Sequence, residues 1–336
     1  MNAKQKILEL LRAEQPGYVS GEYICRQLQV SRTAIWKTVE SLRRDGYEIE
    51  ARPRAGYRLL AAPDVLDPPG WLSGLRSRCI GGTAHYVRTT TSTNDVAKEL
   101  ARQGTEEGMV VVTEEQTKGR GRLGRAWQCP PRAGLCFSVV LYPRVNPMEV
   151  SQFTMLAAVA VVRAFRRSLG INARVKWPND VYIDGLKACG ILAEMTAEAD
   201  RVKFLVLGIG VNINQTREEL VALGNGATSL RIETGRPVSR TEVLRDILEE
   251  LDSLYTLWQA AGFAPLKGLW KDVTLWSGCP VVVTGLQRVW EGIMEDIDDN
   301  GALILRLPDN STKTFYSGEV SLRPIQTNSS GDGSCK

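Results

Sequence analysis

The residue types best suited to chemistry lie in residues 119–127, where three arginines alternate with three glycines before a tryptophan. Arg120, Arg122 and Arg125 carry planar guanidinium groups that can bind phosphate or carboxylate through two hydrogen bonds. Glycines such as Gly119 let the backbone approach a ligand closely and leave its N–H groups free to face an anion. We interpret the segment as an anion-binding loop, with a solvated basic surface loop as the alternative.

The same glycines fit the Gly-x-Gly-x-x-Gly pattern of dinucleotide-binding folds. That pattern requires a helix directly after the glycines, whose N-terminus receives the pyrophosphate. Here Pro130 and Pro131 follow, and paired prolines prevent an immediate long helix. We therefore interpret this match as accidental.

A second group of reactive residue types is the run Lys176-Trp177-Pro178-Asn179-Asp180, which places a cation, an amide and a carboxylate around a proline. An Asx-type turn at the end of a strand would explain Asn179 and Asp180 but not Lys176. Lys187 opens an apolar segment, where a lysine at the end of a strand is usually solvated. Taken singly, each of these signals is weak.

The elements around these residues alternate between strands and helices. Ser92 and Thr93 precede a predicted helix at residues 94–103, so capping is the default role for one of the two hydroxyls. Further patterns predict strands at residues 109–113, 135–141 and 204–214 and a buried helix at residues 150–169. This region is predicted to be a mixed sheet with helices packed on it.

The composition is that of a soluble protein with two or three domains, since 43% of the 336 residues are hydrophobic and 24% are charged. The first residues become charged before any apolar run of signal-peptide length, and no later stretch resembles a membrane span. We expect a cytoplasmic protein without membrane contact.

The histidine and cysteine content limits the kinds of catalytic and metal-binding site that the chain can form. His85 is the only histidine, which argues against Ser-His and Cys-His catalysis and histidine-metal sites, and we expect it to pack within a strand. The seven cysteines are odd in number and form no Cys-x-x-Cys pair, which favours reduced thiols over disulfides or a zinc site.

The positive charge is concentrated at the N-terminus. The net charge is +4, and residues 1–60 carry eleven Lys and Arg against seven Asp and Glu, which accounts for the whole excess. Helices are predicted near residues 4–13, 22–28 and 32–44, with Ser20 and Ser31 as the caps of the second and third. Two short helices joined by a tight turn match a helix-turn-helix.

The third of these helices and the segment after it supply the candidate DNA-binding residues. Residues 47–59 form two alternating segments around a basic turn, which predicts a wing. The candidate DNA contacts are Arg32, Thr33, Trp36 and Lys37 on the helix and Arg52 and Arg54 in the wing. A protein-interaction module with solvated arginines is the alternative.

Composition also indicates the boundaries of the parts. A proline-rich stretch near residues 61–70 separates the N-terminal module from the body, and short alternating strands from Cys279 onward predict a small β domain. We expect a winged helix-turn-helix at 1–62, a catalytic domain at 63–275, a β domain at 276–326 and a disordered tail at 327–336.

Considered together, the motifs resemble a known family. The motifs that occur in the order and spacing of biotin-protein ligases are Ser92-Thr93-Asn94, Glu115-Gln116 before the arginine loop, Lys176-Trp177-Pro178-Asn179-Asp180, Lys187-Ala188-Cys189-Gly190 and Gly208-Ile209-Gly210-Val211-Asn212. With the N-terminal module, the chain from Lys4 to about Arg323 closely resembles the family members that also repress biotin operons. The resemblance implies an α+β multidomain protein, with a class II synthetase-like mixed-sheet ligase domain and a C-terminal SH3-like β barrel.

The resemblance also implies an activity. Such ligases join the carboxylate of biotin to the α-phosphate of ATP, giving biotinyl-5'-adenylate and pyrophosphate, and then pass biotin to a lysine of a biotin carboxyl carrier protein. The first step brings two anions together, so it needs fixed positive charge and Mg²⁺. The implied partners are the carrier protein, operator DNA of biotin genes and a second copy of the chain in a ligand-dependent homodimer.

By motif match, Arg120 and Arg122 would hold carboxylate and phosphate, and Lys187 would stabilise the anionic transition state. Asp180 is the candidate for helping the acceptor lysine lose its proton or for lying near Mg²⁺, and no fixed metal site is expected. The implied biotin contacts are Ser92, Thr93, Asn94, Gln116, Gly119, Arg120, Arg122, Lys187, Gly190 and Gly208. The implied ATP or adenylate contacts are Arg122, Trp127, Lys176, Asn179 and Asn212, with core packing as the alternative for Trp127.

One segment departs from the family pattern. Where the best-known member has a tryptophan over the adenine, this chain has Gly226-Ala227-Thr228-Ser229-Leu230, so we expect adenine coverage and adenylate-driven dimerisation to differ. Three alternatives stay open. They are a lipoate or octanoate ligase of the same fold, a ligand-sensing DNA-binding regulator without catalysis, and an N-terminal module that serves ligase stability rather than DNA binding.

Overall fold

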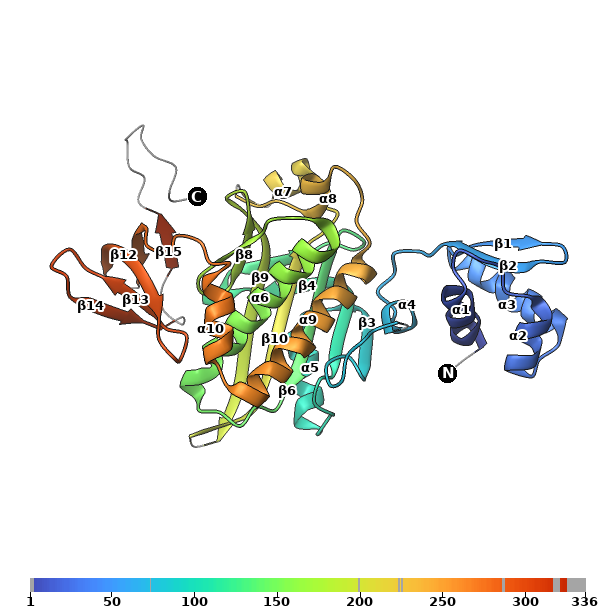
Figure 1. The fold of residues 1–336 in the computed structure, drawn as a ribbon, viewed down its shortest axis with the longest axis horizontal. Coiled ribbons are helices and arrows are strands. Elements are labelled where there is room, and N and C mark those ends of the chain that lie inside the picture. The colour runs from blue at the N-terminus through green and yellow to red at the C-terminus, as the bar shows by residue number, and fades with distance from the viewer. Residues whose placement is uncertain are drawn as a thin grey trace. The chain divides into compact units, whose positions relative to one another are not determined.

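The structure is a computed structural model that describes residues 3–72, 74–198, 200–222, 224, 226–285, 288–316 and 321–324. The chain divides into two compact units, Met1–Val65 and Leu66–Lys336 (Figure 1). The finer predicted boundaries, at residues 62, 275 and 326, stay predictions, and the predicted disordered tail lies outside the described residues.

The N-terminal unit is the predicted winged helix-turn-helix. Its elements are α1 (Ala3–Ala13), α2 (Gly21–Leu28), α3 (Arg32–Arg44), β1 (Glu48–Arg52) and β2 (Gly56–Ala61). Ser20 and Ser31 cap α2 and α3 as predicted, because their hydroxyls accept hydrogen bonds from the backbone N–H groups of Tyr23 and Ala34. Its core contains Ile7, Leu11, Val19, Ile24, Ile35, Val39, Leu42, Ile49 and Leu59.

A mixed sheet forms the centre of the second unit. Its strands, in spatial order, are β3 (Ala84–Thr90), β4 (Val110–Arg120), β6 (Gly134–Leu141), β10 (Arg201–Asn212), β9 (Leu186–Glu198), β8 (Asp180–Ile183) and β7 (Arg174–Lys176). β3 and β4 are parallel and the remaining pairs are antiparallel, and β5 (Ala126–Cys129) pairs with β4. The predicted mixed sheet is therefore confirmed.

Helices cover both faces of this sheet because alternate strand residues point to opposite sides. Val110, Val112 and Leu205 belong to the large core with α6 (Val150–Leu169) and α9 (Arg240–Ala261), the two long helices that cross the sheet in Figure 1. Val111 and Val206 pack instead with Ala97 and Ala101 of α5 (Thr93–Arg102). The shorter helices are α4 (Pro68–Leu72), α7 (Arg217–Ala222), α8 (Leu230–Thr234) and α10 (Ala264–Lys271).

The segment Pro147–Leu169, which includes α6, is long and apolar enough to cross a membrane by length and composition alone. Its most apolar window is 67% buried inside the protein, as expected of a core helix. The predicted helix at residues 150–169 thus has the predicted bounds and the predicted burial.

The C-terminal segment forms a five-stranded antiparallel sheet. In spatial order its strands are β14 (Thr312–Phe315), β13 (Leu303–Arg306), β12 (Val289–Ile297), β11 (Pro280–Thr284) and β15 (Ser321–Pro324). The first four were predicted and β15 was not. The number and direction of the strands fit the expected SH3-like barrel loosely.

Two predictions from single residue types are wrong. His85 is exposed on β3 and does not belong to the core, because β3 is the edge strand of the sheet. Five cysteines are free thiols as expected, but Cys279 is disulfide-bonded.

Candidate active site

The arginine segment is a hairpin rather than the irregular loop that its composition predicts. β4 continues through Arg120, a short 3-10 turn covers Arg122–Gly124, and β5 returns along β4. The N–H of Gly121 donates to the carbonyl of Arg125 at 2.7 Å and closes the turn. Because a strand and not a helix follows the glycines, the dinucleotide pattern is accidental, as predicted.

A cavity of about 330 Å³ lies beside the hairpin. All of the ligand-binding and catalytic residues predicted for the central domain line it except Gly119. The basic side chains that line it are Arg120, Arg122, Arg125, Lys176 and Lys187. Among its described lining residues, Asp180 is the only carboxylate. Such an excess of cations around one carboxylate makes the cavity a binding site for anions.

One end of the cavity is a neutral hydrogen-bond cluster at the start of α5. The Oε1 of Gln116 accepts from the N–H of Thr93 at 2.7 Å and from its hydroxyl at 3.1 Å. The Oγ of Ser138 lies 2.7 Å from the Oγ1 of Thr93 and 2.6 Å from the Oδ1 of Asn94. Ser92 makes no side-chain cap bond to α5, so the default expectation that Ser92 or Thr93 caps the helix is wrong. These hydroxyls belong to the cavity.

Glycines in β9 and β10 let two side chains lie flat on the sheet. A Cβ atom at Gly208 would overlap the amide of Asn94, and one at Gly210 would overlap the indole of Trp127. A Cβ atom at Gly190 would lie 3.0 Å from the same indole. Trp127 is therefore part of the cavity surface, and it is absent from the buried core.

The two reactive groups expected at the centre form one unit. The Nζ of Lys187 lies 2.7 Å from the Oδ1 of Asp180 and 5.4 Å from the ring centroid of Trp127. That carboxylate oxygen is buried and has no well-aligned hydrogen bond among the described residues. The backbone of Lys187 is held by Gly226 and Thr228, in the segment that departs from the family pattern.

Arg122 and Asn179 lie together at the far side of the hairpin. The Nη1 of Arg122 donates to the Oδ1 of Asn179 at 2.9 Å, and the Nδ2 of Asn179 donates to the carbonyl of Ile191 at 2.9 Å. Burial lowers the pKa of Arg122, while the nearby carboxylate of Asp180 opposes that shift. A guanidinium kept from water in this way interacts strongly with an incoming anion.

Lys176 is held between aromatic rings instead of by a carboxylate. Its Nζ lies 4.8 Å from the ring of Tyr182 and 5.6 Å from the ring of Trp276, and it donates to the hydroxyl of Tyr182 at 3.1 Å. Burial is the main cause of its lowered pKa, and Asp180 opposes the shift. Lys176 is thus a partly desolvated cation facing the cavity.

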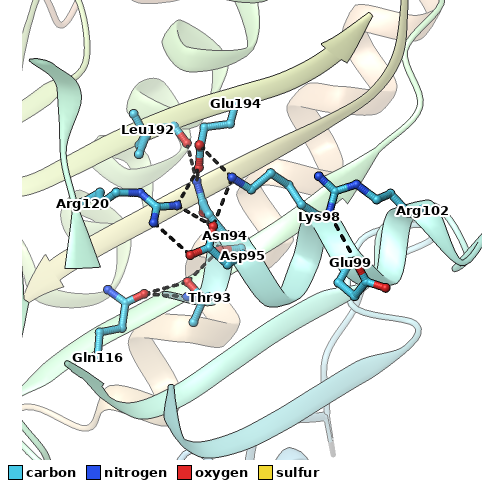
Figure 2. A network of polar contacts seen from close by, with 11 residues as sticks. Thr93, Asn94, Asp95, Lys98, Glu99, Arg102, Gln116, Arg120, Leu192 and Glu194 are labelled. Carbon is cyan, nitrogen blue, oxygen red and sulfur yellow. Dashed lines mark hydrogen bonds and ion pairs between the residues drawn. The ribbon is translucent and has the colours of Figure 1, made fainter. Parts of the chain in front are cut away.

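Arg120 lines the cavity, but its guanidinium is already engaged. It donates to both carboxylate oxygens of Asp95 at 2.9 and 2.5 Å and lies 3.8 Å from Glu194 (Figure 2). The same Glu194 accepts from the Nδ2 of Asn94 at 2.7 Å and from the Nζ of Lys98 at 2.9 Å.

Sequence reasoning missed several residues around the cavity. Glu194 shares a face of β9 with Gly190, so the two-residue period of that strand could have indicated it. Trp276 and the cavity-lining Leu322 carry no local signal, because the fold brings them to the site from distant segments. Tyr182 lies only two residues after Asp180 on β8 and was not singled out as a partner of Lys176. Within the described residues, no three His, Cys, Asp or Glu side chains are grouped to hold a metal.

Comparison with known proteins accounts for all three parts of the chain. Residues 86–212 match the biotin/lipoate A/B protein ligase family, residues 4–58 an HTH domain, and residues 277–323 the biotin protein ligase C-terminal domain. The bifunctional ligase/repressor BirA of Bacillus spizizenii is 37% identical over 320 residues, which cover 95% of this chain and 98% of that protein. The chain belongs to the bifunctional ligase/repressor family. BirA of Escherichia coli is 30% identical over 91% of this chain and 94% of its own length.

A solved ligase structure supports the fold assigned to this ligase/repressor. The biotin protein ligase from Aquifex aeolicus in complex with biotin and ATP superposes with a TM-score of 0.62 and is 30% identical. The match covers 72% of this chain and 99% of that one.

The repressor part of this ligase/repressor presents the predicted DNA-contacting side chains on its surface. Arg32, Thr33, Trp36 and Lys37 are exposed along one side of α3, whose opposite side is buried at Ile35, Val39 and Leu42. Arg52 and Arg54 are exposed at the turn of the wing. Reciprocal backbone bonds between Val19 and Tyr57 tie the wing to the segment before α2.

Proposed function

We propose that this protein activates biotin with ATP to form biotinyl-5'-adenylate and transfers biotin to a lysine of a biotin carboxyl carrier protein. The observation that carries the proposal is one cavity whose described lining residues include five basic side chains and a single carboxylate, with an adjoining neutral hydrogen-bond cluster. A ligand with a neutral polar head and a carboxylate tail fits this site, because its head can bind the neutral cluster and its carboxylate can bind the basic side chains. ATP is the second anionic ligand.

The neutral cluster is proposed to bind the head of biotin. Thr93, Asn94 and Gln116 present fixed donors and acceptors in a largely buried place, where an unmatched polar group would be costly. Gly208 provides room for Asn94, and Ser92 borders the same cluster. This arrangement supports discrimination of a ureido head from an aliphatic or dithiolane head.

In the first step, a carboxylate oxygen of biotin attacks the α-phosphorus of ATP, and the bond to the pyrophosphate leaving group breaks. Lys187 and Arg122 are proposed to stabilise the negative charge that develops there, because both cations face a cavity poor in carboxylates. Lys176 is proposed to bind the phosphate tail, with Asn179 and Asn212 contacting the nucleotide. The indole of Trp127 supplies a flat apolar surface at the same place.

In the second step, the amine of the acceptor lysine attacks the acyl carbon of the adenylate, and AMP leaves. We propose Asp180 as the group that takes the proton of that amine, since it is the carboxylate beside the reacting atoms. Mg²⁺ would enter with the ATP phosphates and reduce their charge.

Exchange of labelled pyrophosphate into ATP tests the ligase. The proposal expects exchange that depends on biotin, and transfer of biotin to a carrier domain in a second assay. Exchange supported by lipoate or octanoate and not by biotin would overturn the substrate assignment.

We also propose that the protein represses biotin genes as a ligand-dependent homodimer in the cytoplasm. The exposed cations and Trp36 along α3, together with the wing arginines, support operator binding. A mobility-shift assay with DNA from upstream of the biotin genes is expected to show a shift that biotin and ATP strengthen. A shift that ignores biotin and ATP, or no shift at all, would remove the repressor assignment.

A further inference from the structure

The carboxylate of Glu194 lies where two parts of the site meet. One of its oxygens accepts from the amide of Asn94 at 2.7 Å, and this amide belongs to the neutral cluster. The other accepts from Lys98 on α5 at 2.9 Å, and Arg120 of the hairpin lies 3.8 Å away (Figure 2). Glu194 thus contacts the head-binding cluster, α5 and the cationic hairpin at once.

Asp95 completes this arrangement from the first turn of α5. Arg120 binds it through two hydrogen bonds, at 2.9 and 2.5 Å, and Lys98 lies 3.1 Å from the same carboxylate. The guanidinium lowers the pKa of Asp95, and Asp95 in turn raises the pKa of Arg120. Two cations and two carboxylates therefore form a charge-balanced network, which we call the anchor network: Asp95, Lys98, Arg120 and Glu194.

Arg120 is bound to Asp95 through both oxygens of the carboxylate, so two of its five N–H groups are engaged and the plane of the guanidinium is fixed. Lys187 also pairs with a carboxylate, but as a single point charge that a bound anion can draw away. Lys176 donates to a phenol. The network also joins elements that the sequence keeps apart, because Arg120 lies at the end of β4, Asp95 on α5 and Glu194 on β9.

We propose that Asp95 and Glu194 are positioning residues that fasten the hairpin, through Arg120, to the helix and strand that carry the biotin-head cluster. Arg120 then acts by holding Arg122 and Trp127 over the cavity and not by binding the reacting carboxylate. The inference rests on the proposed biotin-activating function and deepens it, since it links the binding of the head group to the position of the hairpin.

The first test needs no ligand. Limited trypsin digestion of the unliganded full-length protein reports how often the bonds after Arg122 and Arg125 become accessible. The variants Asp95→Asn and Glu194→Gln are expected to be cut several-fold faster than wild type at these bonds. Glu99→Gln is the matched control, because Glu99 pairs with Arg102 on an exposed side of the same helix (Figure 2). Cleavage of Asp95→Asn and Glu194→Gln at the same rate as wild type and Glu99→Gln would overturn the proposal.

The second test compares pyrophosphate exchange in Asp95→Asn, Arg120→Gln and Glu99→Gln. Anchoring predicts that Asp95→Asn and Arg120→Gln each raise the KM for biotin by about fivefold with little change in kcat, as expected for a partly exposed two-point ion pair. It also predicts that the double variant Asp95→Asn/Arg120→Gln has a KM no higher than that of the more impaired single variant, because both changes break the same contact. Glu99→Gln should behave like wild type.

The opposite pattern would contradict the proposal. If Arg120 binds the reacting carboxylate, Arg120→Gln should lower kcat, and Asp95→Asn should leave activity unchanged or improve it by releasing the guanidinium. Failure of the proposed function is distinguishable, since wild-type protein would then show no biotin-dependent exchange while the digestion experiment would still report on the hairpin.

Discussion

Lys187 and Asp180 form an ion pair at 2.7 Å that crosses from β9 to β8 in the middle of the cavity. The resemblance of the motifs assigned them separate tasks, one to adenylate formation and one to transfer. From this contact we expect an order of events. A ligand carboxylate or phosphate that binds Lys187 should compete with Asp180 and leave that carboxylate available when the acceptor lysine arrives.

Asp180→Asn is expected to separate the two half-reactions. Biotin-dependent pyrophosphate exchange should stay within a few-fold of wild type, because Asn retains the shape of Asp and Lys187 keeps its charge. Transfer from isolated biotinyl-adenylate to a carrier domain should fall by about 10²–10⁴-fold if this carboxylate takes the proton. Rapid-quench measurement of each step decides the matter, and an equal loss in both would contradict the assignment of Asp180 to transfer.

Gly208→Ala is expected to disrupt the biotin-head cluster. The added methyl group would occupy the space of the Asn94 amide, which is held on both sides by Ser138 and Glu194. The KM for biotin should rise by about 5- to 150-fold, by loss of about 1–3 kcal/mol of polar interaction. Gly268→Ala is the control, since a methyl group there meets nothing within 4 Å on α10. A wild-type KM in Gly208→Ala would show that Asn94 does not contribute to this site.

The lowered pKa of Lys176 predicts an early alkaline loss of ATP binding. Burial disfavours the charged form, and Arg323, Lys187 and Arg125 act in the same direction, while Asp180 opposes them. The folded-state pKa lies below the ordinary value for lysine, so the cation is lost as the pH rises through that lowered value.

The KM for ATP should therefore rise at a lower pH than an ordinary lysine would cause. In Lys176→Arg the alkaline rise in the KM for ATP should move to higher pH, because arginine stays protonated. Steady-state kinetics from pH 7 upward provide the comparison. If the KM for ATP rises at the same pH in both proteins, Lys176 is excluded as the cause of that rise.

Arg240 is fully buried at the start of α9, and its Nη1 donates to Glu114 at 2.8 Å. The other oxygen of Glu114 accepts from the N–H of Leu66 at 2.8 Å, at the beginning of the second unit. Glu114→Gln should destabilise this unit by about 3–5 kcal/mol, because it removes the negative charge beside a buried guanidinium. Urea unfolding provides the free energy, and a loss below about 1 kcal/mol would mean that other partners of Arg240 suffice.

Local sequence patterns predicted those elements that local forces determine. The third helix and the helix at residues 150–169 have the predicted bounds, because capping residues and an apolar face can be recognised from residues that are close in sequence. The hairpin was predicted only as a loop, since glycine and arginine do not indicate strand pairing by themselves. His85 was misplaced because a local pattern does not show that a strand lies at the edge of its sheet.

Apart from Gly119, the predicted site residues meet in one cavity, because proteins that share this order of motifs share the fold that brings them together. The side chains that hold these residues in place were not predictable from the motifs. Glu194 acts across β9, β4 and α5, while Trp276 and Leu322 reach the site from the segments around the C-terminal sheet. Such contacts depend on tertiary packing between residues more than 70 positions apart.

Mass spectrometry of the protein mixed with biotin, ATP and Mg²⁺ tests the central claim most directly. The account predicts biotinyl-5'-adenylate in the wild-type protein and at least about 10²-fold slower formation in Lys187→Ala, which lacks the cation at the reacting carboxylate. Absence of the adenylate in wild type, or formation of lipoyl- or octanoyl-adenylate instead, would contradict the account.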